Sequence, residues 1–122
     1  MSEDHFHDPA DRSYARQLRN AAPAEFDAYR NFSQTAVSRE DGQIPPKYRE
    51  LLAVAVALTT QCVYCLETHT ASAARLGATP EELAETVYVT AALRAGGAAA
   101  HGLMAMKLYE RARKGFDASN NA

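Results

Sequence analysis

Hydrophobic residues recur along most of the chain at intervals of three and four, which is the period of an amphipathic α-helix. Pro9, Pro23 and Pro46 each stand where such a pattern begins, and proline is favoured at the first position of a helix. No stretch shows the alternation typical of a β-strand. The pattern predicts helices over residues 9–20, 23–38, 46–60, 62–76, 80–95 and 98–115.

The longest apolar run, residues 51–58, predicts a helix that is buried on every side. It follows a polar first turn, and it places Glu50 where the helix passes from solvent into the core. A buried strand is the alternative for an apolar run this short. The helical spacing of the preceding residues favours the helix.

The clearest local signal is a capping box at Thr79, Pro80 and Glu82. Threonine is a preferred N-cap, proline suits the first helical position, and a glutamate at the third position bonds back to the N-cap. Further on, Gly96 and Gly97 are expected to interrupt the helix and to separate it from a last one. The predicted fold class is all-α with about six helices.

Residues 91–102 consist largely of alanine and glycine. Such small side chains let two helix backbones approach closely, either within the chain or between subunits. The chain also has few large hydrophobic residues to fill the core of a monomer. We therefore expect a homo-oligomer.

The length and the net charge of the chain indicate how many domains it has and which classes of partner are not expected. A chain of 122 residues predicts one domain over 1–122, with a core over about 23–110 and mobile tails at 1–8 and 116–122. The net charge of −2 gives no reason to expect nucleic acid or an anionic membrane as a partner. The acidic N-terminus is unlike a signal peptide, and no apolar run approaches the roughly 20 residues of a membrane span. These features predict a cytoplasmic protein.

The candidate chemistry lies in Cys62, Cys65 and His69. The two cysteines are the only ones in the chain, and on a helix the spacings of three and four place both sulfurs and the imidazole on one face. In a reducing compartment such a pair indicates catalysis, redox sensing or metal binding rather than a permanent structural disulfide. A thiolate at a helix start is stabilised by unpaired backbone N–H groups, which favours Cys62 as the more readily ionised thiol.

Three interpretations account for this cluster. A redox pair, in an enzyme or in a non-catalytic sensor, needs a thiolate, a second thiol and a proton path through His69 and the upstream Glu50. A tetrahedral zinc site would add Glu50 or His101 as a fourth ligand, but structural zinc sites usually draw ligands from two separate segments. The third interpretation is two small buried thiols and a packed histidine. The spacing favours a redox pair with no cofactor and no metal, and His5 and His7 are expected to be solvated.

The spacing of Glu50, Cys62, Cys65 and His69 resembles the E-x11-C-x2-C-x3-H signature of the alkylhydroperoxidase D-like branch of the carboxymuconolactone decarboxylase family. The surrounding segments are similar to that family as well: PPKYRELLAVA before the motif, HTASAARLGATPEEL after it, and ALRAGG further on. The resemblance covers roughly residues 23–108. Four functional positions at the family's spacing are far more specific than a lone CxxC.

The resemblance implies an all-α fold in which the CxxC begins a helix in a mostly buried pocket, with subunits assembled as trimers or hexamers. It also implies a thiol-dependent peroxidase that an external dithiol donor, such as a lipoyl or thioredoxin-like protein, reduces again. By this resemblance Cys65 attacks the peroxide, Cys62 resolves the sulfenic acid, and Glu50 and His69 relay protons. The residues themselves favour Cys62 as the thiolate, so they leave the choice of attacking cysteine open.

One position departs from the family's pattern. The best-known peroxidases of this branch carry a histidine just before the second cysteine, where this chain has Tyr64, a poor base near neutral pH. The family's decarboxylases lack the cysteine pair, which disfavours lactone decarboxylation here.

Tyr64 and His101 are the weaker candidates for the pocket lining, and a packed histidine at a subunit contact is the alternative for His101. Tyr48 and Arg49 are either solvated or bind an acidic group of the substrate.

Overall fold

The computed structural model describes residues 7–121, and every regular element in this range is helical. The all-α prediction is confirmed, with five α-helices instead of about six, together with a 3-10 helix and a π-helix within the same range. In chain order the elements are η1 (Pro9–Tyr14, 3-10), α1 (Ala15–Ala21), α2 (Pro23–Ser33), η2 (Gln34–Ser38, π), α3 (Pro46–Thr60), α4 (Val63–Arg75) and α5 (Pro80–Asn120).

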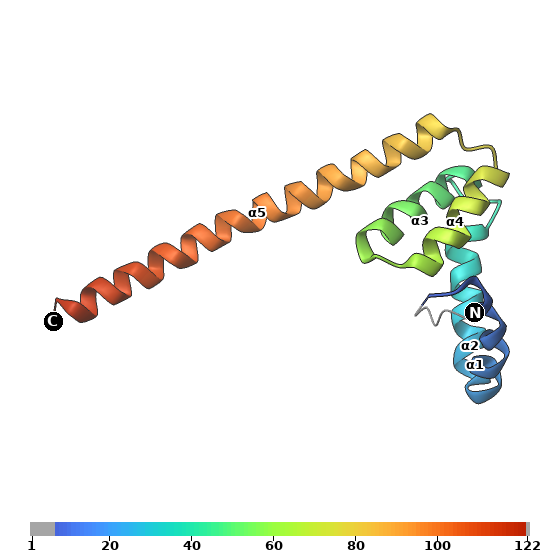
Figure 1. Cartoon of the computed structure of the whole chain (residues 1–122), viewed down its shortest axis with the longest axis horizontal. Helices are drawn as coiled ribbons and strands as arrows, with labels where there is room; N and C mark the ends of the chain where they lie inside the picture. Colours follow the sequence, from blue (N-terminus) through green and yellow to red (C-terminus); the bar gives the residue numbers. More distant parts are fainter. Residues whose placement is uncertain (1–6, 122) are drawn as a thin grey trace, which may run out of the picture.

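Helix α3 is the centre of the fold, because both α4 and α5 pack against it (Figure 1). Its buried residues are Glu50, Leu51, Val54 and Ala57. They recur at helical spacing along one side, and Val54 is only 1% exposed. Ala73 of α4 and Thr90 of α5 are the buried residues of the two partner helices. The core of the single chain is therefore small.

The opposite side of α3 is exposed in the single chain, which corrects the expectation of burial on every side. Leu52 is 53% exposed and Val56 is 61% exposed. The reason is geometric, because the contacts of α3 come from α4, α5 and η2, which leave this side of the helix uncovered in the described chain. The predicted burial of the CxxC helix is corrected in the same way, since Ala73 is the one buried residue of α4.

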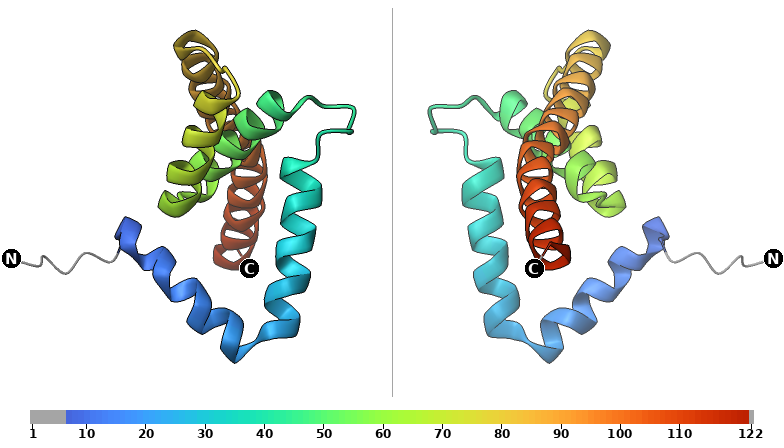
Figure 2. Two further views of the ribbon diagram at one scale, coloured as in Figure 1. Left: turned by 90° about the vertical axis from the view of Figure 1, so that its right-hand side faces the viewer. Right: turned by 90° about the vertical axis from the view of Figure 1, so that its left-hand side faces the viewer.

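The N-terminal elements form an arm (Figure 2). α1 and α2 pack against each other, are joined at Ala22 and enclose a V, and η2 continues α2 towards α3. Pro23 begins α2 as predicted, and Asp8 caps η1 by accepting a hydrogen bond from the backbone N–H of Ala10. The arm brings η1 back beside the start of α4, where Asp11 contacts Tyr64.

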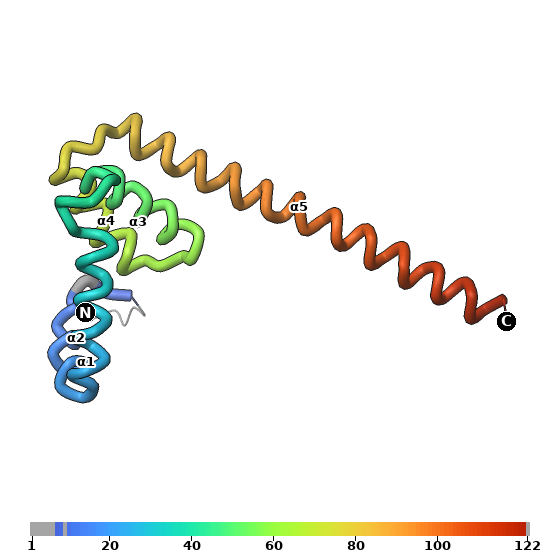
Figure 3. Tube along the Cα trace, turned by 180° about the vertical axis from the view of Figure 1, so that it is seen from behind, coloured from blue at the N-terminus to red at the C-terminus, as the bar shows by residue number. Residues whose placement is uncertain are grey.

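Helix α5 runs without a break through Gly96 and Gly97, which corrects the predicted interruption. Each glycine costs about 1 kcal/mol relative to alanine in a helix, but the neighbouring alanines are the strongest helix formers. The helix ends at Asn120 rather than near Gly115, and much of it projects away from the other helices (Figures 1 and 3). A Cβ added at Gly96, Gly97 or Gly102 would meet no atom within 4 Å. The small-residue segment therefore has no close neighbour within the described chain.

Local signals at the helix ends are confirmed. Thr79 accepts a hydrogen bond from the backbone N–H of Glu82, and the Glu82 carboxylate accepts one from the N–H of Thr79, which completes the capping box. Gly77, with φ of +88°, takes the left-handed conformation after Leu76, the C-cap of α4. No helix in the described part of the chain combines the length and the apolar character needed to cross a membrane.

Candidate redox site

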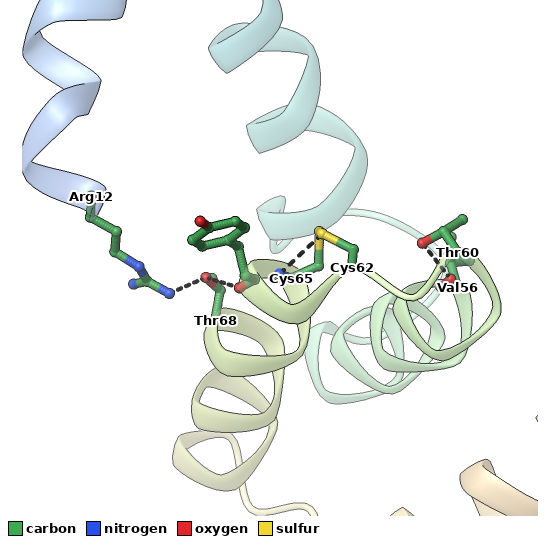
Figure 4. Close-up of a disulfide and its surroundings, with 7 residues drawn as sticks. Arg12, Val56, Thr60, Cys62, Cys65 and Thr68 are labelled. Atoms are coloured by element: carbon green, nitrogen blue, oxygen red, sulfur yellow. Dashed lines mark hydrogen bonds between the residues drawn. A yellow bond between two sulfur atoms is a disulfide. The ribbon is translucent and has the colours of Figure 1, made fainter. Parts of the chain in front are cut away.

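The connection between α3 and α4 places the cysteine pair at the start of a helix. Gln61 ends α3 in the left-handed conformation, with φ of 57°, and Cys62 is the N-cap of α4. Cys62 and Cys65 form a disulfide with a Cα–Cα distance of 5.2 Å. The Sγ of Cys62 also accepts a hydrogen bond from the backbone N–H of Cys65 at 3.3 Å (Figure 4). The predicted place of the CxxC at a helix start is confirmed.

His69 and Glu50 form the second part of the site. Nδ1 of His69 lies 2.6 Å from Oε2 of Glu50, which links α4 to α3. The Glu50 side chain is 7% exposed and that of His69 is 22% exposed, so water screens the pair weakly. A carboxylate this buried needs such a hydrogen-bonding partner. A proton on Nδ1 that is donated to Glu50 leaves Nε2 as the nitrogen that can accept another.

A cavity of about 360 Å³ connects the two parts, because both Cys65 and His69 line it. Most of its wall is aliphatic, with Leu52, Ala53 and Val56 from α3 and with Ala36, Val37 and Ile44 from η2 and the loop that follows. Pockets of this size hold small organic ligands. Charged groups inside an apolar wall also interact more strongly than they do in water.

The two sulfurs differ in their access to this cavity. Cys65 lines it, whereas Cys62 is not part of the wall. Cys62, as the N-cap, instead faces a backbone N–H group of the first turn of α4. Access to a substrate therefore favours Cys65, while stabilisation of a thiolate by the helix start favours Cys62.

Tyr64 contacts the N-terminal arm. Its hydroxyl donates a hydrogen bond to Oδ2 of Asp11 at 2.6 Å. This hydrogen bond raises the pKa of Tyr64 and lowers the pKa of Asp11, because it favours the phenol and the carboxylate over their other protonation states. The tyrosine ring also meets the ring of His7 edge-on, with 4.1 Å between centroids. Tyr64 is not part of the cavity wall, so in the single chain it anchors the arm beside Cys65.

Two further contacts hold η1 against α4. Arg12 donates a hydrogen bond from Nη2 to Oγ1 of Thr68 at 2.6 Å (Figure 4). The same nitrogen lies 3.8 Å from Oε1 of Glu67. Nε2 of His7 lies 3.6 Å from Oε2 of Glu67. His7, predicted to be solvated, is therefore part of a docked segment, while His5 lies outside the described residues.

His101 lies on the exposed part of α5. Its Nδ1 is 3.0 Å from the carbonyl oxygen of Gly97 in the same helix, and it does not line the cavity. A role for His101 at the pocket therefore requires a second copy of the chain. Within residues 7–121, no group of three or more histidine, cysteine or acidic side chains is arranged to hold a metal ion.

Two features of the site are missing from the sequence prediction. Residues 36–44 supply part of the cavity wall from a π-helical turn and a loop, where the apolar residues show no periodic pattern that indicates a pocket. The contact of Tyr64 with Asp11 joins residues 53 positions apart, and no local signal connects them.

Comparison with known proteins reveals similarity at the level of sequence and of fold. The sequence profile of the carboxymuconolactone decarboxylase family matches residues 23–108, which contain Glu50, both cysteines and His69. A crystal structure of a carboxymuconolactone decarboxylase family protein from Legionella pneumophila is similar, with a TM-score of 0.61 and 30% sequence identity. The similarity covers 66% of this chain and 70% of that chain.

Two curated proteins are similar in sequence. The first, named uncharacterized protein 4 in cox locus, is from Paracoccus denitrificans and is 43% identical over 70 residues, which are 57% of this chain and 63% of that protein. The second, an uncharacterized protein of Cupriavidus necator, is 32% identical over 93 residues, which are 76% of this chain and 80% of that protein. The matched part of the chain spans less than two thirds of the length of the Paracoccus protein.

Proposed function

Since this chain belongs to the carboxymuconolactone decarboxylase family, and its cysteine pair adjoins a buried Glu50–His69 pair, we propose that it is a thiol-dependent peroxidase of the alkylhydroperoxidase D-like branch. The observation that carries the proposal is that one cavity is lined by both Cys65 and His69. A nucleophile, a base and the carboxylate that orients the base thus share one site. The size of the cavity suits a small organic peroxide.

The proposed reaction begins with the reduced cysteine pair. Cys65 loses its proton to His69 and attacks the terminal oxygen of the hydroperoxide. The S–O bond forms as the O–O bond breaks, and the leaving alkoxide takes the proton from His69 to become an alcohol. The Cys62 thiol then attacks the Cys65 sulfenic acid, which releases water and forms the disulfide. The peroxide gains the two electrons that the dithiol loses.

Cavity access assigns the two cysteines in this proposal. Cys65 is the attacking residue because its position in the wall allows contact with a bound peroxide. Cys62 is the resolving residue, and the hydrogen bond that its sulfur accepts from the backbone N–H of Cys65 supports its thiolate for the second step. Glu50 acts through His69 as a positioning residue, since it holds Nδ1 and orients the ring.

The cycle requires an external dithiol, for which a lipoyl or thioredoxin-like protein is the proposed donor. One donor thiolate attacks the disulfide to give a mixed disulfide, and the second donor thiol completes the exchange. Val63, which lies between the cysteines, is 50% exposed and both cysteines are partly exposed, which supports access by a protein donor from this side. Such donors belong to reducing compartments, and the cytoplasm is the proposed location.

The proposed working form is a homo-oligomer, either a trimer or a hexamer. Several large apolar residues of α5 are more than half exposed in the single chain, among them Leu93, Leu103, Met106 and Phe116. Exposed apolar surface of this extent is typical of an interaction site, and a projecting helix is stabilised mainly by packing against a partner. A second copy that covers α5 would supply this packing.

The docked N-terminal arm supports a second candidate function, a non-catalytic redox sensor. Tyr64 is next to Cys65 in the sequence, and its hydroxyl is hydrogen-bonded to Asp11 of η1. Oxidation or reduction of the cysteine pair therefore takes place beside a contact that holds the arm against α4. In a sensor, oxidation would change a binding surface and would not turn over a substrate. Fast peroxide turnover favours the enzyme, and slow oxidation coupled to a change in oligomeric state favours the sensor.

Steady-state turnover of tert-butyl hydroperoxide with dithiothreitol as reductant tests the proposed function. We expect turnover by the wild-type protein, none by Cys65→Ser, which lacks the attacking thiol, and much slower turnover by Cys62→Ser, which cannot form the disulfide and depends on dithiothreitol to reduce the sulfenic acid directly. Trapping reagents for sulfenic acid should label Cys65 in Cys62→Ser after peroxide treatment and should label nothing in Cys65→Ser. Full turnover in either variant contradicts the proposal, and a labelled Cys62 in Cys65→Ser reverses the assignment of the two cysteines.

A further inference from the structure

One positively charged side chain lines the redox cavity, whose wall is otherwise mostly aliphatic. Arg49, in the first turn of α3, lines this cavity together with Cys65 and His69. Its Nε donates a hydrogen bond to the carbonyl oxygen of Ile44 at 2.9 Å, and its Nη1 donates one to that of Ala36 at 2.6 Å. The guanidinium is thus fixed in place by two backbone groups that do not neutralise its charge.

Arg49 has no carboxylate partner among the described residues. No acidic side chain of residues 7–121 forms an ion pair with it. Asp41 is near enough for Arg49 to contribute to the lowering of its pKa, but the Asp41 carboxylate is bound to Nε of Arg39 at 3.0 Å. A Cβ at Gly42 would collide with Nη2 of Arg49, so the glycine provides room for this end of the guanidinium.

We propose that Arg49 binds a carboxylate on the substrate, so that the substrates are medium-chain hydroperoxy acids. This inference rests on the proposed peroxidase function and specifies its substrate class. The two backbone hydrogen bonds use Nε and one N–H of Nη1, so the second N–H of Nη1 and the N–H groups of Nη2 are the donors left for the two oxygens of a carboxylate. In a mostly aliphatic cavity the resulting ion pair is screened less than it is in water. The aliphatic wall contributed by α3 and η2 suits the hydrocarbon chain of such a substrate.

The separation of Arg49 and Ala57 along α3 gives an approximate length for the test substrate. The backbone N–H of Cys62 donates a hydrogen bond to the carbonyl oxygen of Ala57 at 3.0 Å, so the cysteine pair lies beside that part of α3. Arg49 and Ala57 are two helical turns apart on α3, which corresponds to about 12 Å. At about 1.2 Å per bond of an extended chain, roughly eight to ten bonds span this length. An eight-carbon acid with a terminal hydroperoxide therefore fits the separation.

The test compares ω-hydroperoxyoctanoic acid with its neutral amide on the full-length protein, with dithiothreitol as the reductant for both. Wild-type kcat/KM should be about 10- to 100-fold higher for the acid, chiefly through a lower KM, because the amide forfeits a charged hydrogen bond. Arg49→Gln should bring the ratio close to one, and Arg49→Lys should retain part of it. Arg75→Gln, which removes an exposed arginine of α4 outside the cavity, should retain the whole ratio. Equal wild-type kcat/KM values for acid and amide overturn the inference.

A binding measurement separates failure of this inference from failure of the peroxidase function. Octanoate and octanamide do not react with thiols, so their Kd values for the oxidised protein are independent of turnover. Tighter binding of octanoate than of octanamide, lost in Arg49→Gln, supports the carboxylate site. If neither hydroperoxide is reduced but this difference in Kd is found, the peroxidase function fails and the carboxylate site stands. Equal Kd values for the two ligands in the wild-type protein overturn the carboxylate site whether or not peroxide is reduced.

Discussion

Glu50 illustrates how one residue links the sequence pattern to the proposed chemistry. It lies at the boundary between a polar helical turn and an apolar run, and in the fold it is 5% exposed with its carboxylate against His69. Helical periods of three and four indicated that Cys62, Cys65 and His69 lie close together, whereas the link between Glu50 and these residues came from the resemblance to the family signature. The contact of Tyr64 with Asp11 was not readable, since it depends on how the N-terminal arm folds back.

The Glu50–His69 pair yields a prediction at this scale. His69→Asn removes the proposed base and Glu50→Gln removes the group that holds it, so each should slow disulfide formation by about 10²- to 10⁴-fold. Stopped-flow mixing of the reduced protein with tert-butyl hydroperoxide measures this rate. Glu110→Gln, which neutralises an exposed acid on α5, serves as the control and should react like the wild type. A rate within twofold of wild type in His69→Asn would show that the relay is not needed.

At the scale of elements, the sequence predicted helix starts better than helix lengths. Helices α2, α3 and α5 each begin at a proline, and α5 has a capping box as well. Local chemistry therefore determined where these three helices start. The length of α5 was underestimated, because two glycines weaken a helix without breaking it when alanines flank them. The division of the second predicted helix into α2 and the π-helical η2 has no signal in the hydrophobic pattern.

The docking of η1 on α4 gives a pH prediction. Tyr64 has a raised pKa in the fold, so its contribution to docking is complete below the ordinary tyrosine pKa and is lost as the pH rises through the raised value. Asp11 has a lowered pKa, so its contribution is present above the ordinary aspartate pKa and is lost as the pH falls through the lowered value. The arm should therefore stay docked between about pH 4 and pH 10.

Ultraviolet titration of the tyrosines measures this effect. Tyr64→Phe should remove the phenol that ionises at the highest pH, and Asp11→Asn should return it to the ordinary range, because the carboxylate acceptor is lost. Tyr29→Phe, at an exposed residue of α2, is the matched control for the loss of one phenol. An unchanged high-pH end of the titration curve in Tyr64→Phe would contradict the role of Tyr64 as the anchor of the arm.

At the scale of the whole molecule, the single chain is a small core with two extensions. α3, α4 and the first part of α5 form the core, the N-terminal arm extends from one side, and the rest of α5 projects from another (Figures 1 and 2). The expectation of burial around α3 and in the small-residue segment followed from composition, which does not distinguish contacts within a chain from contacts between chains. The exposed side of α3 and the exposed small-residue segment of α5 are consistent with the proposed homo-oligomer.

The projecting helix gives a prediction about assembly. Sedimentation equilibrium of the wild-type protein should give three or six times the mass of the chain. Leu93→Glu combined with Leu103→Glu should lower this mass, because each variant places a charge on an apolar surface that a second copy is proposed to cover. Lys107→Glu, at a position of α5 that is already charged and exposed, is the control. A wild-type protein that sediments as a monomer would contradict the proposed assembly.

Cys62 and Cys65 are proposed to form a reactive dithiol, and one measurement tests this directly. The fully reduced protein, freed of reductant, is mixed with one equivalent of tert-butyl hydroperoxide, and thiol titration is combined with the intact mass. We expect the loss of two thiols and of two hydrogens from the mass within seconds, as the disulfide forms. No change in thiols or mass over an hour would contradict the peroxidase function.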